Sequence, residues 1–579
     1  MNKNSIQQSI KDISISKLQF RLTLFLLLVL MPTNQIATQN KFLALPDWLH
    51  KATFYQIYPQ SFKDSNGDGI GDLNGITEKL DYVQSLGIDA IWLNPIFESP
   101  FFDAGYDVSD YYKIAPRYGN EQDLKNLLSQ AHKRNIKVVM DLVAGHSSDE
   151  HPWFKASQKK AKNEFSDRYI WTNKKSSKPE NFVSGTFERD GNFLKNFFDC
   201  QPALNYGYVN PNPKNKWEQP ITAKGPQKMR AELRNIIDYW MKQGVDGFRV
   251  DMASSLIKND KDFSETMNLW AEMRTWFQKA YPQGVLIAEW SNPSLSIKAG
   301  FMIDFMMHFN VPGYPSLFFN KGGVFQHDTC YFDVAGNGSA QEFISNYSRE
   351  LKNVGTDGYV SIPTANHDIN RLNSGARNTD EQLKVALTFL FTLKGIPFIY
   401  YGDEIGMRYI PDLPSKEGSV LTNFNNANRT GTRTPMQWDN SSNAGFSVSS
   451  PNQLYLPVDD DTFFPNVVAQ EKNPASLLNF SKYLISLRKS IPALGNDGEI
   501  EFLNSASQTY PLVFVRSAGN EQYLVVVNPS GKKAEIEFQK AEISKTEPVL
   551  VQQVLCSINN QKIKIVADKL SYAIFQLKK

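Results

Sequence analysis

The segment Gly247 to Asp251 (Gly-Phe-Arg-Val-Asp) sets an arginine and a carboxylate two residues apart in a stretch whose pattern predicts a buried β-strand. Side chains alternate between the two faces of a strand, so Arg249 and Asp251 point to the same side. Buried charges are unfavourable unless they are paired or used. The pair is therefore either a structural ion pair or part of a reactive site.

Two more apolar strands end in a carboxylate: Glu289 follows Leu-Ile-Ala, and Asp368 closes Asn-His-Asp. His146 ends the motif Asp-Leu-Val-Ala-Gly-His in the same way. In a closed parallel barrel, active sites lie at the carboxyl ends of the strands. We therefore expect Asp251, Glu289, Asp368 and His146 to converge on one pocket.

Strand-like runs alternate with helix-like runs from about residue 52 onward, which predicts an α/β fold, a (β/α)8 TIM barrel. The interval after the third strand is too long for one crossover, so we expect a small inserted subdomain there. Near the C-terminus, short alternating runs predict an antiparallel β domain. The expected strands are 53–58, 90–93, 137–143, 247–252, 285–290, 302–307, 359–363 and 396–401, and the expected helices include 76–86, 121–134, 232–243, 268–280 and 381–392.

Residues 1–39 predict a secretory signal peptide and leader. A basic region ends at Arg21, and a ten-residue, mostly apolar run follows from Leu22 to Met31. Ten residues span about 15 Å as a helix, roughly half of a bilayer core. We expect a secreted or periplasmic protein without stable membrane insertion, with an uncleaved membrane anchor as the alternative. The rest is expected to form a barrel in two parts (40–145 and 211–492), an inserted subdomain B (146–210) and a C-terminal β-sandwich domain (493–579).

Charge and cysteine content exclude several functional classes. Lys and Arg number 62 against 60 Asp and Glu, a net charge of +2; the first 39 residues hold four basic residues and one acidic, so the remainder carries 2 − 3 = −1. This balance gives no electrostatic basis for binding nucleic acid. Three separated cysteines exclude a zinc ribbon. The sequence has no phosphate loop or dinucleotide fingerprint, so we expect no organic cofactor. We also expect a monomer or small homo-oligomer.

In the same order along the chain, these four motifs resemble the signature segments of the α-amylase superfamily of glycoside hydrolases. The resemblance covers about residues 51–440. It is strongest to the α-glucosidase and oligo-1,6-glucosidase branch, whose flanking motifs match Phe54 to Pro59 (Phe-Tyr-Gln-Ile-Tyr-Pro) and Arg433 to Trp438 (Arg-Thr-Pro-Met-Gln-Trp). It implies a retaining hydrolase of α-glucosidic bonds in short α-glucans, an oligosaccharide substrate, and cleavage from the non-reducing end.

The resemblance also implies roles for individual residues. Asp251 would be the nucleophile, kept ionised by Arg249, and Glu289 the acid/base, kept protonated by an apolar setting beside Trp290. Asp368 would hold sugar hydroxyls. An Asp103–Arg429 pair would close the pocket around a terminal glucose, Tyr106 would stack beneath that glucose, and two histidines would donate hydrogen bonds to it. The implied substrate-binding residues are Asp103, Tyr106, His146, Arg249, His367, Arg429 and Arg433.

Residues 64–72 (Asp-Ser-Asn-Gly-Asp-Gly-Ile-Gly-Asp) resemble the metal loop of the same branch. Oxygen donors alternate with small residues, the pattern that a hard cation needs, so we expect structural Ca²⁺ (or Mg²⁺). Gly75 stands where an EF-hand has its bidentate glutamate, which excludes that motif. A polar turn without an ion is the alternative. The expected ligands are Asp64, Asn66, Asp68, Ile70 and Asp72.

Three positions depart from the family pattern. Gly145 replaces an Asn that helps to bind a second Ca²⁺ in many amylases, Ala203 replaces an Asp, and Met252 matches neither linkage-specific group. The linkage preference therefore stays open. Three alternatives also stay open: an endo-acting α-amylase, a transglycosylase of the trehalose-forming type, and the non-catalytic α-glucosidase-like ectodomain of a transporter subunit.

Overall fold

The computed structural model describes residues 42–306, 313–319, 324, 329–422, 426–505, 508–540 and 542–579. The expected signal peptide lies outside these residues. Residues 44–579 form one compact unit, so the barrel and the C-terminal strands belong to the same body. No helix among the described residues is long and apolar enough to cross a membrane.

Eight parallel strands form the central sheet, in the spatial order β11-β10-β9-β8-β5-β2-β1-β12. The two ends of this order meet, because Pro363 bridges to Phe398 and the Thr364 N–H donates to the Phe398 carbonyl at 2.9 Å. The predicted TIM barrel is confirmed. Its strands are β1 (Phe54–Ile57), β2 (Ala90–Leu93), β5 (Lys137–Val143), β8 (Gly247–Asp251), β9 (Val285–Ala288), β10 (Ile303–Phe305), β11 (Tyr359–Ser361) and β12 (Phe398–Tyr400).

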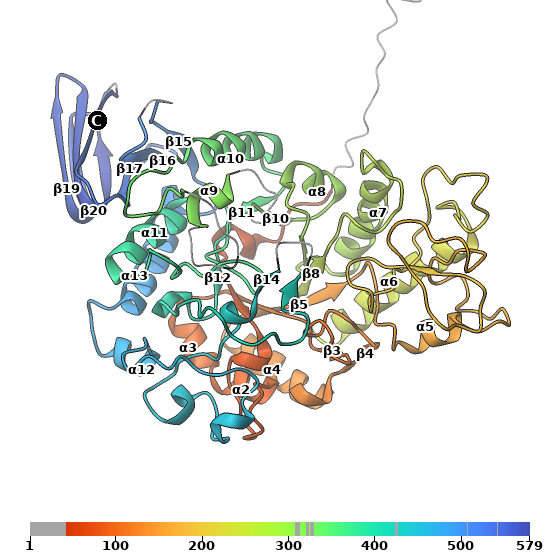
Figure 1. The fold of residues 1–579 in the computed structure, drawn as a ribbon. Helices are drawn as coiled ribbons and strands as arrows, with labels where there is room; N and C mark the ends of the chain where they lie inside the picture. Colours follow the sequence, from red (N-terminus) through yellow and green to blue (C-terminus); the bar gives the residue numbers. More distant parts are fainter. Residues whose placement is uncertain are drawn as a thin grey trace, which may run out of the picture. The chain divides into compact units, whose positions relative to one another are not determined.

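The helices surround these strands (Figure 1). In α4 the residues at spacings of three and four, from Leu124 to Ala131, are buried against the sheet, and Asn120 caps its N-terminus with Asp123. The single helix expected over 76–86 is broken at Lys79 into two. The helices are α2 (Leu73–Glu78), α3 (Leu80–Ser85), α4 (Glu121–Lys133), α6 (Lys224–Lys242), α7 (Ser264–Ala280), α8 (Pro293–Ala299), α9 (Tyr314–Phe318), α10 (Gln341–Val354), α11 (Asp380–Thr392), α12 (Val467–Glu471) and α13 (Leu477–Ser490).

The connection from β5 to β8 contains α5 (Pro152–Ser157), β6 (Phe182–Val183) and β7 (Phe193–Leu194) ahead of α6. It has a small hydrophobic core of its own, in which Ile170, Phe182 and Tyr208 are buried. A β-bridge between His146 and Ala203 ties its far end back to the end of β5. Two other short hairpins flank the barrel: β3 (Phe97–Glu98) with β4 (Asp110–Ile114), and β13 (Val420–Leu421) with β14 (Ala427–Asn428).

The C-terminal region is antiparallel, as predicted. The sequence predicts a β-sandwich there, whereas the structure joins the strands in one hydrogen-bonded sheet. The sheet folds over along its longest strand, because the first half of β20 pairs with β18 and the second half with β17. One face joins the barrel core and the other forms a separate cluster around Val513 and Ile565. The strands are β15 (Glu499–Phe502), β16 (Leu512–Ala518), β17 (Glu521–Asn528), β18 (Ala534–Gln539), β19 (Lys545–Asn559) and β20 (Lys562–Lys578).

Candidate active site

One cavity of about 480 Å³ gathers residues from the ends of four barrel strands. Asp251 is the last residue of β8, and Glu289 follows β9 directly. His146 and Asp368 come from the loops after β5 and β11. All four side chains therefore meet, as the strand-end positions predict. The cavity is lined by Asp103, Tyr106, His146, Phe197, Gln201, Asp251, Met252, Ser254, Phe263, Glu289, Trp290, Ser291, Asn292, Asp368, Leu421 and Arg429.

Three of the ten predicted site residues lie one layer behind the cavity wall. Arg249, His367 and Arg433 are each no more than 1% exposed and contact the lining carboxylates. The structure thus brings the whole predicted set together in two layers. These three side chains act on the cavity through other residues, whereas direct contact with a substrate was expected of them.

Arg249 joins three carboxylates at the centre of the site. Its Nη1 lies 2.7 Å from Asp141 and 3.0 Å from Asp251, and its Nη2 lies 2.8 Å from Glu289. Arg249 and Asp251 point to the same side of β8, as expected. Glu289 differs from the expectation, because its carboxylate also accepts the Met252 N–H at 2.8 Å and so lies in a polar setting.

The charge of Asp251 reflects competing influences. Burial and the nearby charge of Glu289 raise the pKa of Asp251 well above its usual range, and Arg249 opposes them. A second carboxylate so close disfavours the ionised form of Asp251. Arg249 lies where the sequence predicted, but it does not outweigh burial and the Glu289 charge, so the expectation that Arg249 keeps Asp251 ionised is not met.

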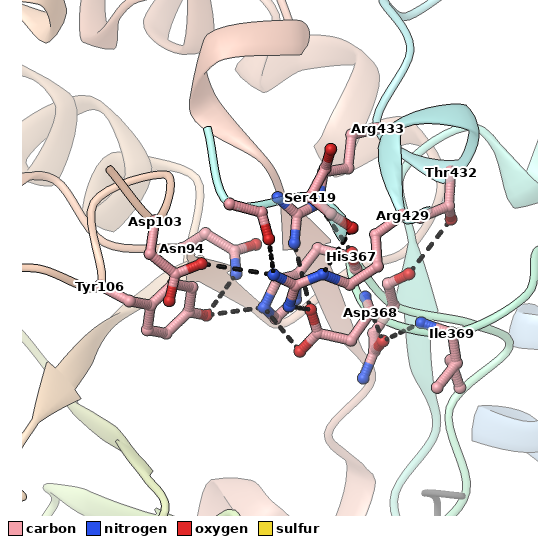
Figure 2. Close-up of polar contacts among 12 residues, drawn as sticks. Asn94, Asp103, Tyr106, His367, Asp368, Ile369, Ser419, Arg429, Thr432 and Arg433 are labelled. Carbon is pink, nitrogen blue, oxygen red and sulfur yellow. Dashed lines mark hydrogen bonds and ion pairs between the residues drawn. The ribbon is translucent and has the colours of Figure 1, made fainter. Parts of the chain in front are cut away.

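Asp368 is held as an anion by the opposite wall (Figure 2). Burial disfavours its charge, but His367, Arg429 and Arg433 outweigh burial and hold the pKa of Asp368 below its usual range. One of its oxygens, Oδ1, accepts hydrogen bonds from both Arg429 and Arg433. Two carboxyls of one cavity therefore differ: the pKa of Asp368 is lowered, and the pKa of Asp251 is raised.

Arg429 also reaches Asp103, whose Oδ1 lies 3.3 Å from Nη2 (Figure 2). The other oxygen of Asp103 accepts the side-chain amide of Gln201 at 2.8 Å. The Arg429 guanidinium is held in place by the Gly418 carbonyl at 2.6 Å. The predicted Asp103–Arg429 pair exists, is more than nine-tenths buried, and forms part of the cavity wall.

Tyr106 presents its ring to the cavity with His367 stacked behind it, the ring centroids 5.4 Å apart and the planes within 7°. Its hydroxyl donates to Asp141 at 3.0 Å and lies 2.8 Å from Nε2 of His367. Nδ1 of His367 is 3.0 Å from the Gln56 amide, so both ring nitrogens are already engaged. His367 therefore positions Tyr106 and Asp368.

His146 lines the cavity as a neutral imidazole, because burial lowers the pKa of His146 to about 3. Its Nδ1 accepts the Asn196 amide at 3.1 Å and its Nε2 lies 3.1 Å from the Tyr106 carbonyl. The neighbouring Gly145 explains a departure noted in the sequence. A Cβ there would lie 2.8 Å from Ser255 and 2.9 Å from Asn196, so these two side chains take the space of the usual asparagine.

Comparison with known proteins identifies the family. Residues 56–497 match the family model for the alpha-amylase catalytic domain. The chain belongs to the α-amylase family of glycoside hydrolases. The oligo-1,6-glucosidase of Parageobacillus thermoglucosidasius is 32% identical over 558 residues, covering 87% of this chain and 94% of that protein. The trehalose synthase/amylase of Mycolicibacterium smegmatis is 31% identical over 485 residues, covering 76% of each.

Among solved structures, a mutant isomaltulose synthase of Erwinia rhapontici in complex with sucrose is similar, with a TM-score of 0.76 at 26% identity. The match covers 93% of this chain and 100% of that one. The α-amylase family resemblance and the α-glucosidase branch predicted from the motifs are confirmed, and the relatives include both glucosidases and sugar synthases.

Three residues without a predicted role support this α-amylase-family site. Asp141 pairs in register with Arg249 on the adjacent strand, which strand alignment could have indicated. Burial raises the pKa of Asp141 to about 6 against the pull of Arg249. Gln201 holds Asp103 from the inserted region and has no local signal in the sequence. Asp304 is the lone acidic residue of an apolar run and pairs in register with Ala288, the residue before Glu289.

The predicted metal loop is a series of tight turns. Asp64 accepts backbone N–H groups of Asn66 at 3.0 Å, Gly67 at 2.7 Å and Gly69 at 2.8 Å, and the Ser447 hydroxyl at 2.6 Å. These four bonds fill the acceptor sites of one carboxylate. Asn66 and Asp68 each accept one backbone N–H and keep oxygen lone pairs available.

The other end of the loop is also tied to the chain. Asp72 accepts the Gly75 N–H at 2.7 Å and caps α2. Within the described part of the chain, no group of three or more His, Cys, Asp or Glu side chains is placed to hold a metal ion. A cation here would therefore depend on a mixed donor set that includes the Asn66 amide and the Ile70 carbonyl.

Proposed function

We propose that this enzyme is a retaining, exo-acting α-glucosidase that releases glucose from the non-reducing end of short α-glucans. The observation that carries the proposal is the cavity in which Asp251, Glu289 and Asp368 meet, with Arg249 joining the first two. Retaining glycosidases use one carboxylate as nucleophile and a second, protonated one as acid. Asp251 and Glu289 are the two carboxyl groups that can take these roles.

In the first step, a carboxylate oxygen of Asp251 attacks the anomeric carbon while Glu289 gives its proton to the departing oxygen. In the second, Glu289 takes a proton from water, and that water releases the sugar with its original anomeric configuration. Asp368, held anionic by Arg429 and Arg433, favours the positive charge that develops on the sugar ring.

Exo action is supported by the Asp103–Arg429 pair, which closes the wall beside Asp368. A buried ion pair with additional hydrogen bonds is rigid, and it presents polar atoms to the hydroxyls of one terminal sugar. The ring of Tyr106, backed by His367, offers a flat surface to the apolar side of that sugar.

Product analysis tests the proposal. We expect glucose to be released from maltose, isomaltose or maltotetraose, with α-glucose as the first anomer seen by proton NMR. Comparing the three substrates measures the linkage preference directly. Release of maltose or longer sugars from maltotetraose would contradict exo action, and a folded but inert wild-type chain would favour the non-catalytic role.

A second candidate is transglycosylation, which the relatives named as synthases favour. The same covalent intermediate can be resolved by a sugar hydroxyl in place of water. Incubation with maltose or sucrose distinguishes the two outcomes, since an isomerising enzyme would accumulate a new disaccharide before free glucose appears.

We also propose that residues 64–72 bind a structural Ca²⁺. Support comes from the oxygen donors at two-residue intervals and the free lone pairs of Asn66 and Asp68. Binding to the folded state alone would stabilise it by about 2.7 kcal/mol at a hundredfold excess over Kd. We expect millimolar Ca²⁺ to raise Tm relative to EDTA.

In Asp68→Asn, whose exposed carboxylate is not part of the core, the Ca²⁺-dependent rise in Tm should disappear. Asp460→Asn, which changes a side chain 99% exposed, serves as the matched control and should keep the rise. An equal shift in both variants, or no shift in the wild type, would exclude this loop as a cation site.

Finally, we propose that the chain is secreted or periplasmic. The support is the order of residues 1–31, a basic region followed by a mostly apolar run too short to span a bilayer.

A further inference from the structure

Asp304 lies next to the segment that follows Glu289. It belongs to β10, where it pairs in register with Ala288 of β9, the residue immediately before Glu289. Its side chain is 0% exposed, and none of the ion pairs formed by the described residues includes it. A carboxylate buried without a cation requires hydrogen bonds to compensate for its lost hydration.

Three of its five hydrogen bonds come from the segment after the acid. Oδ1 of Asp304 accepts the N–H groups of Trp290 and Ser291, each at 3.2 Å, and that of Phe305 at 2.8 Å. Oδ2 accepts the Asn292 N–H at 2.9 Å and the Ser296 hydroxyl at 2.8 Å. Three successive backbone N–H groups that converge on one anion form a nest, and such a nest fixes the conformation of the backbone that supplies it.

This conformation is not one that the segment would adopt freely. Ser291 has a φ of 58°, in the left-handed region that residues other than glycine disfavour. Trp290, Ser291 and Asn292 all line the cavity, and the Glu289 carbonyl accepts the Ala253 N–H at 3.1 Å. A change in the turn would therefore move both the cavity wall and the backbone of the acid.

We propose that Asp304 is a positioning residue for the acid: it holds residues 290–292 in a left-handed turn and thereby sets where Glu289 presents its proton to the leaving group. The proposal rests on the assignment of Glu289 as acid/base. Asp304 contacts no substrate itself. Burial raises the pKa of Asp304 to about 7 against the bonds from Ser296 and the backbone, so those donors offset part of an unfavourable burial.

Asp304→Asn tests the proposal, because an amide cannot accept all of these bonds. The readout is kcat/KM for two substrates that differ in their need for an acid. Maltose must have its leaving oxygen protonated, whereas α-glucosyl fluoride loses fluoride without that proton. We expect kcat/KM for maltose to fall about 10²-fold, within the range general acid catalysis contributes, and the value for the fluoride to change several-fold at most.

Two further variants keep the test decisive. Ser296→Ala removes one donor to Asp304 and should give a smaller change in the same direction. This variant provides the test if Asp304→Asn does not fold. Adding Ser291→Gly to Asp304→Asn should recover about tenfold of the loss on maltose, because glycine adopts the left-handed turn without strain. A purely structural role would not produce this rescue.

Asp403→Asn is the matched control. Asp403 is also buried, but it bonds to Thr364 and Arg371 and does not contact the turn. We expect its substitution to lower Tm and leave the maltose-to-fluoride ratio unchanged. Equal losses on both substrates in Asp304→Asn would overturn the positioning role. A wild-type chain that cleaves neither substrate would instead contradict the proposed function.

Discussion

Replacing Asp251 with asparagine is expected to lower kcat by about 10⁴-fold or more, on the scale seen when a catalytic nucleophile is removed. The amide keeps the size of the side chain but cannot form the covalent bond to the anomeric carbon. Turnover of p-nitrophenyl α-glucoside by the purified chain measures the loss. Because Arg249 retains Asp141 and Glu289 as partners, the variant should still fold, with a Tm close to that of the wild type.

Azide rescue separates the roles of the two carboxylates. In Asp251→Ala, azide fills the vacated space and attacks the anomeric carbon directly, so we expect β-glucosyl azide. In Glu289→Ala with α-glucosyl fluoride, the nucleophile still forms the intermediate, and azide then gives α-glucosyl azide. Identical anomers from the two variants would contradict the assignment of nucleophile and acid.

The sequence predicts that Asp251, Glu289 and Asp368 converge, because residues at the carboxyl ends of barrel strands lie on the same rim. A residue that ends a strand in a parallel barrel lies on the catalytic rim whatever the loops do. Asp251 and Glu289 need only that rule, and both lie where it places them. The Asp103–Arg429 pair comes from family motifs, since 326 residues separate its members and no local pattern joins them.

Other features depend on three-dimensional detail that no pattern carries. The prediction of an apolar setting for Glu289 is wrong, because the Arg249 side chain is long enough to reach this carboxylate at the end of the neighbouring strand β9. The contacts of Asp304 require both the register of β10 against β9 and a left-handed residue in the turn after β9. Asn196 reaches the space beside Gly145 from a loop about fifty residues away, which the chain order does not indicate.

Arg429→Ala is expected to give the second largest effect, a fall in kcat/KM for maltose of about 10²- to 10³-fold. Breaking a buried charged pair by removing one partner typically costs 3–5 kcal/mol, about two to four factors of ten. Here the loss leaves Asp103 without its ion-pair partner and Asp368 with only Arg433 and His367. Since Arg429 helps to hold the pKa of Asp368 low, its removal raises that pKa.

The same substitution tests how the cavity is closed. Without the guanidinium, the wall beside Asp368 opens, so products longer than glucose should appear from maltotetraose, and the preference for maltose over maltotetraose should shrink. Asp103→Asn should give the same change in products while leaving the Arg429 bond to Asp368 in place. Arg408→Ala, which removes a half-exposed arginine paired with Asp459 away from the cavity, controls for the loss of a guanidinium and should release only glucose. If Arg429→Ala and Asp103→Asn also release only glucose, another part of the wall determines exo action.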